Sequence, residues 1–411
     1  MNMINIMGLI LCAVVSSTAF NLSPNPNINM HQPILTTYKN KTRSSYFGYS
    51  INLRKNTLII GAPRAQSNLE TQRKIDEAGV VYKCNLNDEK SCFPYHFDTI
   101  GNTNIENTEF AYNSEKKDFQ MLGASMDGHG SEESRFVVCA PKLIGNVEEA
   151  SHYLLHGICY WVTDTKTPQP SGVRSIIPLR QKSLQVIPYN NLQHYYYIYG
   201  QEGFSVHVTD NNEEIIIGAP GVYNWRGTVI RYVSRALSSN GLSRRSNTKS
   251  HSMKKRQTYE YRSEIPNPFY TTIPDDSYFG YAVSSANFEG PMFTKLYYVA
   301  SAPQAKQQTG EVYIFDIEDH ESQQRIKVFN KFSGDQMGEY FGYAILTEDF
   351  NNDGLPDLAV AAPFHSKNGV YENGAVYVFL NMGNVSEFVE MIIELYLTYY
   401  LIHSWYLNVN H

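Results

Sequence analysis

Near its end the sequence holds nine residues whose oxygen atoms recur at the spacing that a hard metal ion requires. Side chains with oxygen atoms occupy positions 1, 3, 5 and 9, which are Asp349, Asn351, Asp353 and Asp357. Gly354 at position 6 can turn the backbone, and Leu355 at position 7 offers its main-chain carbonyl. Such oxygen-only sets bind Ca²⁺, which accepts flexible coordination by about six to eight oxygens. The segment is therefore predicted to be a calcium loop. The alternative is a turn that is rich in Asp and Asn and holds no metal.

This loop differs from the helix-flanked loop of EF-hand proteins. Position 12 is Val360, where an EF-hand needs a bidentate glutamate, and the flanking residues are typical of strands. A segment at 285–293, one repeat earlier, offers only Glu289 as an acidic side chain. The sequence thus predicts one calcium ion, held by a β-hairpin loop.

The elements that must position this loop belong to a phrase that occurs five times. Each copy has an aromatic-Phe-Gly-aromatic type of element, then a short strand ending in Gly-Ala-Pro or a variant of it. The glycines are Gly48, Gly123, Gly203, Gly280 and Gly342, and the prolines are Pro63, Pro141, Pro220, Pro303 and Pro363. Repetition over units of this size predicts a repeat architecture rather than two or three separate domains.

Short apolar runs within each unit, punctuated by Gly, Pro and Asn, predict strands rather than helices. Examples in the last unit are the runs 340–346, 358–362 and 375–380. Three or four short strands cannot bury both faces alone, so the units must pack on one another, as a propeller or as a solenoid. Long loops between the copies favour an all-β propeller, of which this chain contains about five blades.

The first residues are typical of a secretory signal. An apolar stretch at 4–15 precedes the small residues Ser17, Thr18 and Ala19, so we expect residues 1–19 to be a signal peptide. Its removal leaves Cys84, Cys92, Cys139 and Cys159, an even number that favours two disulfides. Of the three connectivities, the local one, which joins Cys84 to Cys92 and Cys139 to Cys159, is the simplest. Glycosylation sequons occur at Asn21, Asn40 and Asn384.

These features together resemble a known family. The motifs that carry the resemblance are Phe20-Asn21-Leu22, Tyr46-Phe47-Gly48-Tyr49, Val138-Cys139-Ala140-Pro141, Gly218-Ala219-Pro220, the run 275–281 and the calcium loop. Over residues 20–383 the chain resembles the N-terminal FG-GAP β-propeller of integrin alpha subunits, most closely those of insects and other invertebrates. The resemblance implies a seven-bladed type of propeller that pairs with an integrin beta subunit on the extracellular side of the plasma membrane. It also implies calcium-dependent binding of extracellular-matrix or cell-surface ligands, and no catalysis.

The resemblance assigns roles to two groups of aromatic and acidic residues. In the family the residue after each FG glycine points to the central axis and helps to hold a basic side chain of the beta subunit. At these positions stand Tyr49, Phe204, Tyr281 and Tyr343, with Ala124 interrupting the series. Ligand contacts of the family map to Asp275, Tyr223 and Trp225. The matching loop before Gly203 has the sequence His194-Tyr195-Tyr196-Tyr197, without an acid, so the sequence leaves open whether Arg-Gly-Asp is recognised.

The remaining features add limits rather than sites. A basic stretch at 235–256 is predicted to be a solvated loop, with a candidate cleavage site at 254–256, and a net charge of −6 argues against nucleic-acid binding. His152 and His156 lack the Glu and the helix of a zinc motif, so they are predicted to be loop residues. No nucleophile or zinc constellation predicts an enzyme. Residues 384–411 are expected to be a divergent tail outside the propeller, which makes the chain look truncated. The alternative function is therefore a soluble secreted propeller that binds a ligand alone or acts as a decoy.

Overall fold

The fold was analysed in a computed structural model of the chain. The structure describes residues 29–33, 44–88, 91–103, 115–147, 149–180, 185–189, 192–236, 259–267, 272–320, 323–366 and 374–394. The signal segment, the sequons at Asn21 and Asn40 and the candidate cleavage site at 254–256 lie outside these residues.

Five antiparallel sheets of four strands account for most of the described chain. The first contains β1 (Ser50–Leu53), β2 (Thr57–Ala62), β3 (Val80–Asn85) and β4 (Phe93–Pro94). The second contains β6 (Ser125–Gly128), β7 (Phe136–Ala140), β10 (Ile158–Val162) and β11 (Arg174–Ile176). The third contains β14 (Ser205–Val208), β15 (Glu214–Ala219), β16 (Thr228–Ala236) and β17 (Tyr259–Glu264). The fourth contains β18 (Val283–Ala286), β19 (Tyr297–Ala302), β20 (Glu311–His320) and β21 (Gln323–Ser333), and the fifth β22 (Ile345–Glu348), β23 (Asp357–Ala362), β24 (Ala375–Asn384) and β25 (Glu387–Glu394).

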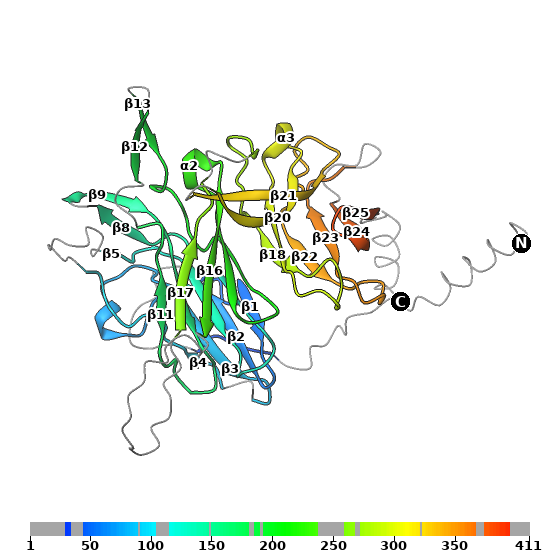
Figure 1. Cartoon of the computed structure of the whole chain (residues 1–411). Helices are drawn as coiled ribbons and strands as arrows, with labels where there is room; N and C mark the ends of the chain where they lie inside the picture. Colours follow the sequence, from blue (N-terminus) through cyan, green and yellow to red (C-terminus); the bar gives the residue numbers. More distant parts are fainter. Residues whose placement is uncertain are drawn as a thin grey trace, which may run out of the picture.

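Smaller elements decorate these sheets. A three-stranded sheet is formed by β5 (Glu115–Lys116), β8 (Ile144–Val147) and β9 (Glu149–Leu155), and a hairpin by β12 (Val186–Tyr189) and β13 (Leu192–Tyr195). Three short helical turns are η1 (Glu70–Gln72), α2 (Val222–Trp225) and α3 (Ala305–Gln308). In Figure 1 the β8, β9, β12 and β13 strands project from one side of the molecule.

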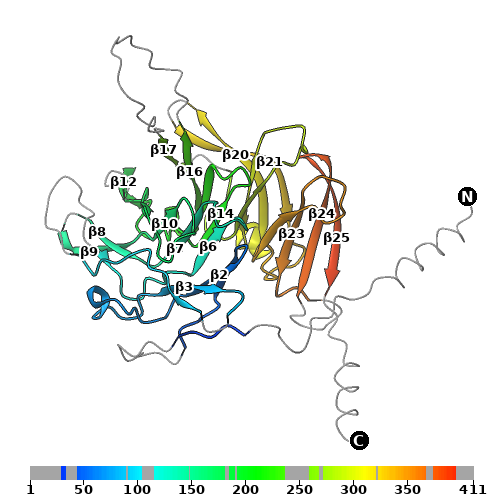
Figure 2. The ribbon, with the colours of Figure 1, turned by 90° about the horizontal axis from the view of Figure 1, so that it is seen from below.

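The first strands of the five sheets lie side by side around a common axis. Strand β6 contacts β1 and β14, and β18 contacts β14 and β22. Figure 2 shows the sheets following one another in chain order, from blue to red. Each sheet is therefore one propeller blade with its first strand innermost. The predicted fold class, an all-β propeller with about five blades in this chain, is confirmed.

Apolar side chains from both faces of the blades build the core. Strand β7 is buried along its whole length because one face packs on the first blade and the other on the third. Phe279 and Phe341, the FG phenylalanines of the fourth and fifth copies, are fully buried between neighbouring blades. Glu202 stands where these copies have phenylalanine, and burial raises the pKa of its carboxyl well above the ordinary value.

A repeated serine ties each of the first three blades to the next one. Ser50 donates from Oγ to the carbonyl oxygen of Gly123 at 2.6 Å, and Ser125 donates to that of Gly203 at 2.6 Å. Ser205 makes the same bond to Gly280 at 2.9 Å. Each serine lies two residues after an FG glycine, so the sequence repeat is also a repeat of inter-blade hydrogen bonds.

Both local disulfides are present. Cys84 of β3 is bonded to Cys92, eight residues later, and Cys139 is bonded to Cys159, 20 residues later. Because Cys139 and Cys159 are opposite each other in the β7–β10 ladder, the second disulfide joins two central strands of one blade.

The boundary expected at residue 383 does not match the fifth blade. Strand β24 continues to Asn384, and residues 387–394 form β25, the fourth strand of the blade. Phe388 packs edge to face on Phe288 and Phe332, at centroid distances of 5.7 and 5.2 Å. The prediction failed because these residues carry no FG, GAP or calcium motif, whereas their backbone pairs with β24 from residue 387 to residue 394.

Candidate functional site

The residues that follow the five FG glycines line one central cavity of about 340 Å³. Besides Tyr49, Ala124, Phe204, Tyr281 and Tyr343, its walls contain Met121, Pro141, Lys142 and Gln201. The convergence follows from the fold, because each residue that follows an FG glycine lies one or two positions before the innermost strand of its blade. Lys142 and Gln201 were missed in the sequence, where no motif marks them. We call this site the aromatic cup.

The rings of the aromatic cup touch one another but remain open to solvent. The centroids of Phe204 and Tyr281 are 4.8 Å apart, and those of Tyr281 and Tyr343 are 6.0 Å apart. Tyr49 and Tyr343 are about half exposed. Burial raises the pKa of Tyr281, so its hydroxyl is neutral and the ring face keeps its electron-rich character. The cup can therefore accept a cationic side chain by cation–π attraction.

The predicted calcium loop at 349–357, called the metal loop below, connects β22 to β23. Several of its side-chain oxygens accept hydrogen bonds from backbone amides of the same loop. Asp349 accepts hydrogen bonds from the amides of Asp353, at 3.1 Å, and Gly354, at 2.8 Å. Asn351 Nδ2 lies 2.8 Å from Asp353 Oδ2. Asn352 and Gly354 adopt left-handed φ values of 60° and 87°, which turn the backbone sharply. The side chains at positions 1, 3 and 5 thus lie together on an exposed loop.

Asp357, the ninth residue of the loop, is fully buried. Its carboxylate accepts hydrogen bonds from the amides of Phe350, at 3.0 Å, and Asn381, at 2.8 Å. Each carboxylate oxygen keeps a second lone pair, so these bonds leave capacity for a cation. Within the described residues no group of three or more His, Cys, Asp or Glu side chains forms a ready-made metal cage. The loop would fit a hard cation by combining carboxylates with the oxygens of Asn351 and the Leu355 carbonyl.

The predicted ligand contacts lie close together: Tyr223 and Trp225 belong to α2, and Asp275 is bound by Arg226, which follows α2. Trp225 stacks on Tyr199, with centroids 5.5 Å apart, and Tyr223 packs against Tyr196 at 4.7 Å. Asp275 is bound by Arg226, whose Nε donates to Asp275 Oδ1 at 2.7 Å. Sequence reasoning missed Arg226, although it directly follows Trp225 in the chain.

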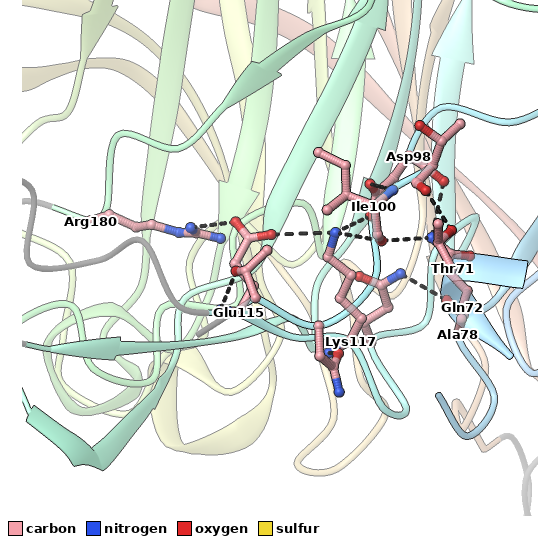
Figure 3. Close-up of polar contacts among 12 residues, drawn as sticks. Thr71, Gln72, Ala78, Asp98, Ile100, Glu115, Lys117 and Arg180 are labelled. Carbon is pink, nitrogen blue, oxygen red and sulfur yellow. Dashed lines mark hydrogen bonds and ion pairs between the residues drawn. The ribbon is translucent and has the colours of Figure 1, made fainter. Parts of the chain in front are cut away.

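A buried polar network joins Asp98, Glu115, Lys117 and Arg180 (Figure 3). Lys117 Nζ lies 2.5 Å from Asp98 Oδ2, 3.1 Å from the carbonyl oxygen of Ile100 and 3.5 Å from Glu115 Oε2. Arg180 Nη1 binds the other oxygen of Glu115 at 2.6 Å. Since Glu115 lies in β5, the network links the segment after the first blade to the segment after the second.

Comparisons with known proteins place these features in a family. An FG-GAP repeat model matches residues 341–379. Integrin alpha-PS3 of Drosophila melanogaster is 44% identical over 390 residues, which cover 91% of this chain and 34% of that protein. Integrin alpha-PS5 of the same species is 38% identical over 379 residues, with 91% and 33% covered, and integrin alpha-8 of Gallus gallus is 29% identical over 394 residues, with 91% and 32% covered. The chain is an insect-type relative of the integrin alpha subunits. It spans about a third of the length of these curated relatives.

This integrin alpha relative also contains a chain of Asp, His and Ser that sequence reasoning missed. His207 Nδ1 lies 3.2 Å from Asp127 Oδ2, and His207 Nε2 lies 2.9 Å from Ser285 Oγ. The three residues come from the innermost strands of three consecutive blades. Ser285 is only 2% exposed and sits inside strand β18, so a substrate carbonyl cannot approach its hydroxyl. The arrangement therefore ties blades together rather than forming a nucleophile.

Other expected features of the integrin alpha relative fall in different places. His152 lies in β9 rather than in a loop, and His156 follows that strand, buried, with Nε2 2.8 Å from Gln185 Oε1. Burial lowers the pKa of His156 to about 4.

The sequon residue Asn384 ends β24 and is exposed, and its glycosylation remains a prediction. No helix in the described part of the chain is long and apolar enough to cross a membrane.

Proposed function

We propose that this chain forms the propeller of a cell-adhesion receptor. It pairs with an integrin beta subunit, binds extracellular-matrix or cell-surface proteins, and lies on the extracellular side of the plasma membrane. The observation that carries the proposal is the convergence of Tyr49, Phe204, Tyr281 and Tyr343 on one cavity. Rings that are open to solvent at the axis of a propeller offer a binding site for a partner's Lys or Arg, because a cation over a ring face is attracted by its quadrupole.

Calcium supports this function by bracing the fifth blade. The residues that would hold it are Asp349, Asn351, Asp353, Asp357 and the carbonyl of Leu355. Bound there, Ca²⁺ would offset two of the three negative charges on the loop and keep the β22–β23 connection in a single conformation.

The aromatic cup is tested by removing two of its rings. Tyr281→Ala together with Tyr343→Ala is expected to weaken capture of a co-expressed insect integrin beta subunit about thirtyfold, since each of the two cation–π contacts contributes about 1 kcal/mol. Capture is measured by co-precipitation from secreted material over a series of beta-subunit concentrations. Phe293→Ala, which removes a half-exposed ring from the β18–β19 loop, is the control and should leave capture unchanged. Equal capture by the parent and the double variant would contradict the proposal.

The metal loop is tested with a fluorescent calcium competitor. Asp353→Ala is expected to weaken Ca²⁺ binding by about tenfold or more, because calcium affinity depends on the number of charged ligands. Glu348→Gln, which neutralises an exposed carboxylate just before the loop, is the matched control. If Asp353→Ala binds calcium as tightly as the parent, the loop is an Asp- and Asn-rich turn and no metal site.

A further inference from the structure

The surface beside α2 is built from a strained turn that its neighbours hold in place. Tyr223, Asn224 and Trp225 have φ values of 52°, 53° and 62°, a left-handed run that side chains other than glycine rarely adopt. Backbone hydrogen bonds clamp the turn from both sides: the amide of Tyr223 donates to Tyr196 at 2.6 Å, and the amide of Tyr278 donates to Trp225 at 2.8 Å. Strain of this kind persists only where the surroundings enforce it, and it is common at binding sites.

Asp275, the acidic residue among the predicted ligand contacts, already has a cationic partner within the chain. Arg226 Nε and Nη2 both donate to Asp275 Oδ1, the first at 2.7 Å. The guanidinium also lies over the ring of Tyr223, 4.9 Å from its centroid. The side chain of Arg226 is 15% exposed, whereas that of Asp275 is 70% exposed. The guanidinium is therefore fixed underneath the carboxylate and not displayed to solvent.

A second guanidinium would gain little from such a carboxylate. It would meet an acid whose charge is balanced at hydrogen-bond distance, and it would approach the like charge of Arg226. Next to the pair, Tyr199 and Trp225 form a stacked, nearly parallel platform in which each ring is about two-fifths exposed. An amphipathic aromatic surface of this kind favours apolar and aromatic side chains.

We infer that Arg226 is a specificity-determining residue that takes the place of a ligand's basic side chain at Asp275. The surface then selects protein segments that present an apolar or aromatic side chain to the Tyr199–Trp225 platform, and it does not select Arg or Lys. This inference rests on the proposed ligand-binding function, but it concerns this chain alone and needs no beta subunit.

The experiment removes the internal cation from the full secreted chain. The probes are a capped Gly-Arg-Gly peptide and its citrulline counterpart, which has the same shape without the charge. The readout is the change in tryptophan fluorescence, to which Trp225 beside the site contributes together with the two other tryptophans of the chain. The parent should not distinguish the two peptides. Arg226→Gln should bind the arginine peptide about tenfold more tightly than the citrulline peptide, because a charge-assisted hydrogen bond to Asp275 becomes available. Adding Asp275→Asn should abolish that preference, whereas Asp276→Asn should leave it intact.

Matched variants keep the outcome decisive. Arg226→Lys retains the positive charge and should behave like the parent. A parent that already prefers the arginine peptide, or an equal gain in Arg226→Lys and Arg226→Gln, would overturn the inference. If Arg226→Gln does not fold, Asp275→Asn in the parent background decides: loss of arginine-peptide binding there would show that Asp275 is open to ligands. Failure of beta-subunit capture by the cup would leave all these results unaffected.

Discussion

Replacing Lys117 by methionine is expected to lower the free energy of unfolding by about 3 to 5 kcal/mol, as when one partner of a buried ion pair is removed. Lys117 is 1% exposed, and its ammonium group forms ion pairs with Asp98 and Glu115 and donates a hydrogen bond to the carbonyl oxygen of Ile100 (Figure 3). Methionine fills a similar volume but carries no charge. The carboxylate of Asp98, which is 5% exposed, would then be buried without a cationic partner. The change is measured as the shift in the urea midpoint, followed by tryptophan fluorescence.

The control for this prediction is an ion pair of the same type on the surface. Lys166 Nζ lies 2.9 Å from Glu133 Oε1, but both side chains are more than half exposed. Lys166→Met is therefore expected to change the free energy of unfolding by less than about 1 kcal/mol. If the two lysine variants shift the urea midpoint equally, burial of the network contributes nothing beyond an ordinary surface pair.

The repeat made most of the fold predictable because every copy encodes the same local physics. A glycine at φ of about 90° occupies the FG position of every blade, and a short apolar strand that ends in Ala before a Pro follows in each copy. Apolar side chains on both faces of such strands, with polar turns between the strands, require each blade to pack on its two neighbours, and β7, β15 and β19 are accordingly buried along their whole length. The residues after the glycines must then converge, which is why the positions of the aromatic cup could be read from the sequence.

What the sequence did not reveal depends on contacts between segments without a shared motif. Lys117 and Asp98 stand in irregular segments after the first blade, and nothing in their neighbours marks them as partners. Arg226 meets Asp275 across 49 residues, so its role appears only when the third and fourth blades are placed side by side. Strand β25 was missed because its residues are ordinary for a strand and carry none of the repeat motifs. Motifs thus locate the repeated positions, whereas pairing of single charges requires the three-dimensional structure.

Asp357→Ala is expected to lower the free energy of unfolding even without calcium. Asp353→Ala is expected to lower it only when calcium is present. The buried carboxylate of Asp357 accepts the amides of Phe350 and Asn381, and hydrogen bonds to a charged group contribute about 1.5 to 3 kcal/mol each. We therefore expect Asp357→Ala to lower the free energy of unfolding by about 3 kcal/mol or more in EGTA. Asp353 is exposed and bonds only within its own loop, so its loss should leave stability in EGTA nearly unchanged.

Thermal unfolding with and without calcium separates these two roles of the loop. Calcium should raise the melting temperature of the parent, since an ion that binds only the folded state stabilises it by mass action. Asp353→Ala should start from the parent's value in EGTA and gain little from calcium, whereas Asp357→Ala should start lower. Asp357→Asn keeps one oxygen acceptor and should fall between the parent and Asp357→Ala in EGTA. A parent-like melting temperature for Asp357→Ala in EGTA would mean that the carboxylate contributes nothing to the blade itself, and that its burial serves the metal alone.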